Sequence, residues 1–174
     1  MTNSDYELKM SIEEIRNKIN VYKKHWLHKY TTNCYAYALG LDVPEYKICY
    51  HAYQPGVMSG NQKVDYDSFS YDDLIANIYT DFETLGIEVH KIYPLQEVNK
   101  DMWKISLFIP EKDPDNLDDF HFLKCLPDNT WNHKYGYNGQ IINFDDNDRT
   151  ITNPEECYLE DLKYDKTFGL RLKK

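Results

Sequence analysis

The sequence predicts an α+β fold in which N-terminal helices pack on an antiparallel β-sheet. In two early segments, residues 11–26 and 71–86, apolar residues recur every three or four positions, as they do in amphipathic helices. After residue 86 the apolar runs are short and bounded by turn residues, which is typical of strands. Helices followed by strands indicate an α+β order. A length of 174 residues without a repeat or long linker predicts one domain over residues 1–174.

The first helix is expected to begin after Ser11 and to run to about Trp26. Ser11 followed by Glu14 matches a capping box, in which each side chain bonds to the other residue's main chain. Its apolar residues lie on one face and are expected to pack on the body of the protein. They are Ile12, Ile15, Ile19 and Tyr22.

A short second helix is expected from Cys34 to Gly40. Thr31, Thr32 and Asn33 are good N-cap residues, and Gly40 is a natural stop. The third helix is expected from Tyr71 to Gly86, with its apolar residues facing inward. Between them, residues 52–70 hold turn formers without a period and predict a loop. This loop either shapes access to a site or is an ordinary surface connection.

Five strands are expected: residues 87–93, 103–109, 119–126, 130–136 and 167–172. The third and fourth form a hairpin across the turn at 127–129. If Leu126 pairs with Thr130, then Leu123 lies opposite His133, and His121 lies opposite Tyr135. Because side chains alternate along a strand, both histidines then share one face. A register slip of one residue would reverse that assignment.

Three residues far apart in the sequence can supply a nucleophile, a base and an orienting group: Cys34, His121 and His133. The reactive thiolate persists at neutral pH when a helix N-terminus or an imidazolium lowers its pKa, and both devices are predicted here. The alternative for Cys34 is a small buried apolar residue. The alternative for each histidine is a structural residue of the strand.

This pattern resembles the papain-like fold, and especially its NlpC/P60 branch of cysteine hydrolases. In that family a cysteine opens a helix, a histidine lies on a later strand, and a second polar residue follows on the next strand. The resemblance implies that Cys34 is the nucleophile, His121 the general base and His133 its orienting partner. Three segments are also similar to an uncharacterised bacterial and viral group of this fold, and that similarity names no substrate. They are Asn33–Leu39, Gln54–Gly60 and Trp131–Gly136.

Three further residues are candidates for stabilising an oxyanion or contacting substrate: Asn33, Tyr30 and Gln54. Asn33 or Tyr30 could donate a hydrogen bond to the oxyanion beside the main-chain N–H of Cys34. The alternative for Asn33 is a plain N-cap. Gln54 belongs to the turn-rich loop.

No cofactor and no metal are expected. Four cysteines and several histidines could ligate zinc, but structural zinc sites favour paired ligands at short spacings, and the sequence has none. It has neither a phosphate-binding loop nor a dinucleotide glycine fingerprint. The sparse cysteines are expected to be free thiols, as is typical of a reducing cytoplasm.

The formal net charge of −9 disfavours direct binding to nucleic acid or to an anionic membrane surface. No signal peptide or apolar membrane span is recognisable, so a cytoplasmic location is expected. The leading hypothesis is a thiol-dependent hydrolase, of peptidase or amidase type, that acts on a peptide, isopeptide or small amide through an acyl-enzyme. An acyltransferase is a less favoured variant. The alternative is a catalytically idle acidic module that docks a basic protein, as a nucleic-acid mimic or inhibitor would.

Overall fold

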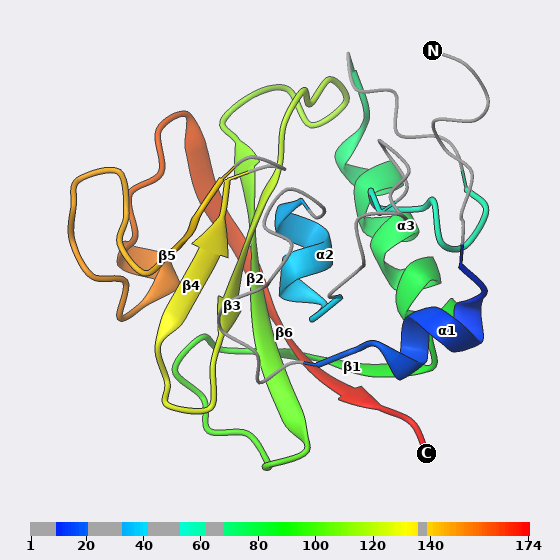
Figure 1. The fold of residues 1–174 in the computed structure, drawn as a ribbon. Coiled ribbons are helices and arrows are strands. Elements are labelled where there is room, and N and C mark those ends of the chain that lie inside the picture. The colour runs from blue at the N-terminus through cyan, green and yellow to red at the C-terminus, as the bar shows by residue number, and fades with distance from the viewer. Residues whose placement is uncertain (1–9, 21–32, 42–52, 62–67, 136–138) are drawn as a thin grey trace.

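The computed structural model describes residues 10–20, 33–41, 53–61, 68–135 and 139–174. In these residues the fold is α+β, with few helices and one six-stranded antiparallel sheet, as predicted (Figure 1). The helices are α1 (Ile12–Asn17), α2 (Cys34–Ala38), α3 (Tyr71–Thr84) and the short 3₁₀ helix η3 (Pro154–Glu156). The strands are β1 (Ile87–Ile92), β2 (Met102–Pro110), β3 (His121–Cys125), β4 (Trp131–Lys134), β5 (Ile141–Ile142) and β6 (Leu162–Leu172).

The strand order across the sheet is β1-β6-β2-β3-β4-β5, so the last strand of the chain lies between the first two. The long strand β6 pairs with both β1 and β2, so the C-terminal segment forms an interior strand next to the edge strand β1. Helices α2 and α3 cover the same face of the sheet (Figure 1). No described helix combines the length and apolar character needed to cross a bilayer.

Two apolar clusters lie on opposite faces of the sheet. The larger one lies between the sheet and the helices, and Tyr35 of α2 joins it with Phe122 of β3 and Leu107 of β2. The smaller one contains Leu123 of β3 and Trp131 of β4, and the segment from 143 to 162 covers it. Successive residues of β3 therefore contribute alternately to the two clusters, as strand geometry requires.

The expected helix from residue 11 to about Trp26 is wrong in its length. The capping box at its start is confirmed: Ser11 Oγ accepts the Glu14 N–H at 3.1 Å, and Glu14 Oε2 accepts the Ser11 N–H at 2.7 Å. The helix ends at Asn17, and Ile19 forms an antiparallel bridge with Leu41. A tertiary strand contact thus replaces the helical hydrogen bonds that the apolar period favoured. Residues 21–26 lie outside the described residues.

The hairpin is confirmed in its register. Leu123 pairs with His133, and the Leu126 N–H donates to the Thr130 carbonyl at 2.9 Å. Two strands differ from expectation. The last strand begins at Leu162, five residues earlier than predicted, because β2 continues to pair with it as far as Pro110. The two-residue β5 was not predicted, since it is too short to carry a pattern.

Candidate active site

Helix α2 places Cys34 in its first turn, as the sequence predicted. The Asn33 side chain forms the N-cap: its Oδ1 accepts the Ala36 N–H at 2.8 Å. Its Nδ2 donates to the Tyr53 carbonyl at 3.2 Å and ties the start of the helix to the loop at 53–61. Asn33 is therefore an N-cap in this structure, and it supports Cys34 from the preceding position.

Burial governs the protonation of Cys34, whose side chain is 6% exposed. It raises the pKa of the thiol from 9.0 to about 12. The main-chain N–H groups of Phe122, Tyr35 and Cys34 itself pull that pKa down, and the charge of Asp119 pushes it up. The expected lowering of the thiol pKa is thus outweighed by desolvation, and Cys34 is a neutral thiol at pH 7.

The two histidines are brought together as predicted. His121 Nε2 lies 2.8 Å from His133 Nδ1, and His133 Nε2 lies 2.9 Å from the Phe144 carbonyl oxygen. A carbonyl can only accept, so His133 carries its proton on Nε2 and uses Nδ1 as an acceptor. His121 must then donate through Nε2. This series of hydrogen bonds leaves His121 Nδ1 as the basic nitrogen of the pair.

Burial keeps both imidazoles neutral. It lowers the pKa of His121 from 6.5 to about 3, and the neighbouring His133 contributes to the same shift. The pKa of His133 is also lowered by burial, although its bond to Phe144 opposes the change. The ring of Tyr135 stacks on His121 at a centroid distance of 5.1 Å and helps to hold it. At neutral pH the site therefore has a neutral thiol and a neutral base, not a preformed ion pair.

Cys34 and His121 lie beside the same peptide group. The N–H of Phe122, which directly follows His121, acts on the Cys34 sulfur. Within the described residues no hydrogen bond joins the thiol to either imidazole. The Tyr35 ring of α2 packs on Phe122 at 5.2 Å, whereas His121 lies on the alternate side of β3, which carries the smaller cluster. The thiol and the imidazole thus approach the first peptide of β3 from its two sides.

The remaining sequence candidates are Tyr30 and Gln54. Tyr30 lies outside the described residues. Gln54 is buried, and its Oε1 has no hydrogen-bond partner in the described part of the chain. The loop that contains it is buried at residues 53–58, so within that stretch it is not an ordinary surface connection.

Sequence reasoning missed Asp81, a buried carboxylate of α3 that organises this region. It accepts the Tyr35 hydroxyl at 2.9 Å, the Gly56 N–H at 2.7 Å and the Ser59 N–H at 3.1 Å. It thereby joins α3 to the residue after Cys34 and to the loop that supports Asn33. Burial raises its pKa above the usual value for an aspartate. No periodicity distinguishes Asp81 from a surface residue of the helix.

The second group that was missed is a pair of buried lysines, Lys124 on β3 and Lys134 on β4. Both side chains are 0% exposed. The Lys124 ammonium lies 5.0 Å from the centre of the Tyr37 ring, and burial lowers its pKa to about 7. The alternation of side chains along the hairpin could have predicted their burial, because both lysines share the face of the aromatic Phe122.

No cluster of three or more metal-ligating side chains occurs among the described residues. Cys49 and His51, two further potential zinc ligands in the sequence, lie outside the described residues. Cys34, Cys125 and Cys157 are free thiols, as expected for the cysteines that can be described.

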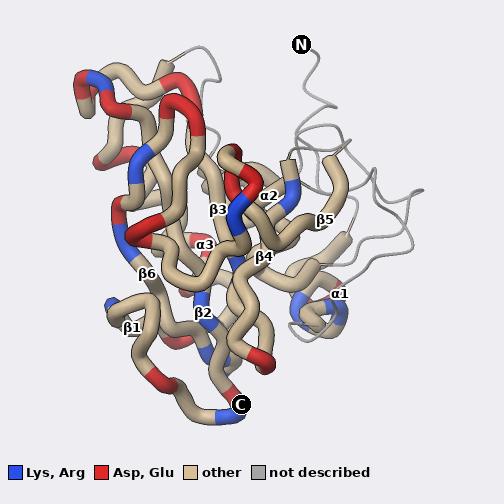
Figure 2. Tube along the Cα trace, turned by 90° about the vertical axis from the view of Figure 1, so that its left-hand side faces the viewer, with Lys and Arg blue, Asp and Glu red and all other residues tan. Residues whose placement is uncertain are grey.

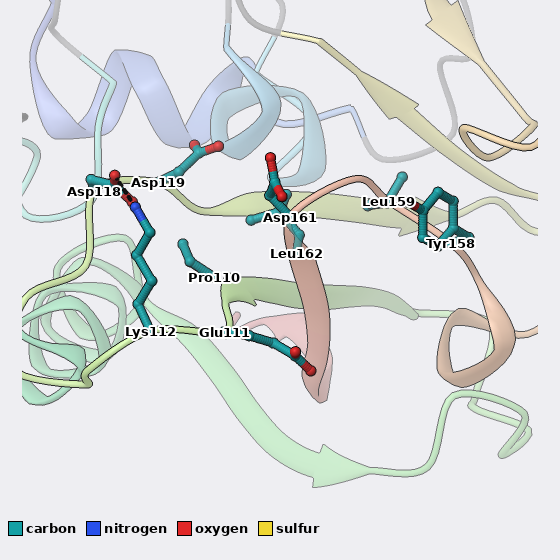
Figure 3. Close-up of a pocket in the computed structure, with 9 residues that line it drawn as sticks. All are labelled: Pro110, Glu111, Lys112, Asp118, Asp119, Tyr158, Leu159, Asp161 and Leu162. Atoms are coloured by element: carbon teal, nitrogen blue, oxygen red, sulfur yellow. Dashed lines mark hydrogen bonds and ion pairs between the residues drawn. The ribbon is translucent and has the colours of Figure 1, made fainter.

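A cavity of about 910 Å³ opens near Asp119, the carboxylate that acts on Cys34 (Figure 3). Its walls carry Glu111, Asp118, Asp119 and Asp161, and Asp118 is paired with Lys112. Figure 2 shows acidic segments in the loops of the same chain, with fewer basic residues between them. The cavity therefore favours a cationic group over an anionic one.

Comparisons with known proteins add no relative. No protein-family model matches the chain, and neither a curated protein nor a solved structure matches it. What the site does is therefore inferred from its geometry alone.

Proposed function

We propose that the chain is a thiol-dependent hydrolase with a papain-like, NlpC/P60-like arrangement of Cys34, His121 and His133. One observation carries the proposal: the sulfur of Cys34 lies beside the peptide that follows His121, and His121 is itself held by His133 and the Phe144 carbonyl. A nucleophile thus lies on one side of the first peptide of β3, and a base with its orienting group lies on the other side.

In the proposed reaction the Cys34 sulfur attacks the carbonyl carbon of an amide or ester. Nδ1 of His121 accepts the thiol proton as the S–C bond forms, and it later returns this proton to the leaving group. Water then hydrolyses the thioester, and the thiol is restored. Because thiol and imidazole are both neutral, the proton moves during attack and not beforehand. The thiol and the imidazole lie on opposite sides of β3, so the proposed transfer requires that they be bridged, directly or through one water, once substrate binds.

The main-chain N–H of Cys34 is the proposed oxyanion donor. It opens α2, where the first N–H groups have no intrahelical acceptor. A donor of this kind contributes about 3–4 kcal/mol to the transition state of acyl transfer. The Asn33 amide is already bonded to Tyr53 and Ala36, so it acts through the shape of the helix start.

Acetylation by p-nitrophenyl acetate tests this proposal. The full chain is expected to form an acetyl-enzyme on Cys34, located by peptide mass spectrometry. Cys34→Ala should abolish this acetylation, and His121→Ala should slow it about 100-fold or more, which is typical of losing a general base. Cys125 is the matched internal control, since it is also a buried free thiol. Acetylation of Cys34 that is no faster than that of Cys125, or that is unchanged in His121→Ala, would contradict the proposal.

The acidic cavity favours a second candidate, a docking module for a basic protein segment. Glu111, Asp119 and Asp161 contribute carboxylates to its walls, none of which forms an ion pair within the described residues, and a lysine-rich segment would complement them. The two functions separate in Cys34→Ala: a docking module keeps its affinity for a lysine-rich peptide in that variant, whereas the hydrolase loses its reaction.

A further inference from the structure

The position of Lys134 at the end of β4 follows from the hairpin register. Leu123 pairs with His133, so the next pair along the hairpin brings Lys134 opposite Phe122. Side chains alternate, and Lys134 therefore lies on the face opposite His133. That face is the one on which α2 packs, since Phe122 contacts Tyr35 of that helix. Lys134 thus lies beneath the start of α2 with its side chain fully buried.

Cys34, at the start of α2, lies against the same position of the hairpin from the helix side. The main-chain N–H of Phe122, the residue opposite Lys134, lowers the pKa of the Cys34 thiol. The two side chains also interact electrostatically. Burial lowers the pKa of Lys134 from 10.5 to about 8, and the charge of Cys34 opposes part of that shift. A buried cation and a nucleophilic sulfur are therefore neighbours in the interior.

Among the residues that the structure describes, the other charged and titratable groups near Cys34 do not supply positive charge to its sulfur. Lys124 lies on the same face but over the Tyr37 ring, and burial alone accounts for the shift of its pKa. Asp119, which precedes β3, opposes the thiolate. Tyr35 donates its hydroxyl to Asp81. The two histidines occupy the alternate face of the hairpin.

We infer that Lys134 is the cationic partner of Cys34 and stabilises negative charge on its sulfur. Its role in catalysis rests on the proposed hydrolase function, whereas the pairing itself does not. No bond to Lys134 forms or breaks: the thiol proton passes to His121, and the ammonium lowers the energy of the developing thiolate. Lys134 is thus an electrostatic positioning group beside the reacting sulfur.

The test is the pH dependence of Cys34 alkylation by iodoacetamide in the folded full chain, followed by peptide mass spectrometry. A rise of one unit in the thiol pKa lowers the fraction of thiolate about tenfold. Lys134→Met is therefore expected to slow alkylation about tenfold or more at pH 8. Lys134→Arg keeps the charge and should stay within about threefold at that pH. At higher pH it should exceed the wild type, because the lysine loses its proton while the guanidinium does not. The matched control is Lys124→Met, a buried lysine on the same face, which should leave the alkylation rate unchanged.

Lys134→Gln is a second neutral variant, and circular dichroism shows which variants are folded. Wild-type alkylation profiles in folded Lys134→Met or Lys134→Gln would overturn the inference. If both neutral variants unfold, Lys134→Arg decides: a faster rate than wild type at high pH supports the pairing, and an identical profile overturns it.

The acetylation assay separates this inference from the proposed function. Alkylation that depends on Lys134, without acetylation of Cys34 by p-nitrophenyl acetate, overturns the hydrolase and leaves the pairing. Wild-type acetylation in a folded Lys134→Met variant supports the hydrolase and overturns the role of Lys134.

Discussion

The two faces of the β3–β4 hairpin bury polar groups by different means. On one face His121 and His133 form a hydrogen-bonded chain that ends at the Phe144 carbonyl. On the other face Lys124 and Lys134 are buried against α2, and their pKa values fall to about 7 and about 8. An imidazole can donate and accept while neutral, whereas an ammonium can only donate and is charged. The hairpin therefore places hydrogen-bonded neutral imidazoles on one face and two buried lysines on the other.

The largest expected effect comes from breaking the imidazole chain. His133→Ala removes the acceptor that sets the tautomer of His121, so acetylation of Cys34 should fall about 100-fold. His133→Asn should restore most of the rate, because an amide oxygen can still accept from His121 Nε2. The measurement is the rate of acetylation by p-nitrophenyl acetate.

His90→Ala is the matched control for this experiment, since His90 is an exposed histidine of β1. It should react as the wild type does. An equal loss in His133→Ala and His133→Asn would mean that an acceptor at this position does not restore the rate, and it would contradict the role given to the hydrogen bond.

The imidazole face should also make the protein sensitive to acid. The unfolded histidines take up protons near pH 6.5, whereas His121 in the folded protein resists protonation down to about pH 3. The unfolded state then binds more protons, and stability falls as the pH decreases between these values. Each unit of pH costs about 1.4 kcal/mol per histidine while this difference persists. Urea unfolding between about pH 6.5 and about pH 4.5 measures the slope.

A variant with His121→Gln and His133→Gln should lose this slope. Carboxylates with lowered pKa values, Glu88, Asp118 and Asp145, titrate below their usual range and add to acid sensitivity only at lower pH. A slope in the double variant equal to that of the wild type would assign the effect to other groups.

On the lysine face, Lys124→Met is expected to stabilise the protein. The Lys124 ammonium has no hydrogen-bond partner in the described part of the chain. Replacing a buried charge by an apolar side chain of similar volume can gain about 1–4 kcal/mol. In the wild type, stability should rise with pH from about 7 to 10.5, because the unfolded lysine keeps its proton and the folded one loses it. The variant should lose the part of this rise that begins near pH 7, whereas Lys134, whose pKa falls to about 8, still contributes above pH 8. Thermal unfolding across this range measures both effects.

Lys104→Met provides the contrast. Its ammonium donates to the carbonyls of Pro94 at 2.7 Å and Gln96 at 3.0 Å, so removing it should destabilise the protein. If both variants changed stability in the same direction, hydrogen bonding would not be what separates the two lysines.

Local chemistry made the hairpin predictable. The turn formers at 127–129 and the alternation on both sides favour a pairing that joins Leu126 to Thr130, and the structure has the register that follows from it. The N-caps at Ser11 and Asn33 were readable for the same reason, since a cap needs only a side-chain oxygen and the next few N–H groups. The length of α1 was not, because the bridge from Ile19 to Leu41 depends on a distant segment.

The sequence by itself determined the α+β order, the helical setting of Cys34 and the shared face of His121 and His133, because these depend on neighbours within a turn or a hairpin. Only the tertiary structure decided which face of the hairpin meets α2, and with it the burial of Lys134 on the side of Cys34. It also decided the protonation states. Burial raises the pKa of Cys34 and lowers that of His121, and burial depends on segments far away in the sequence.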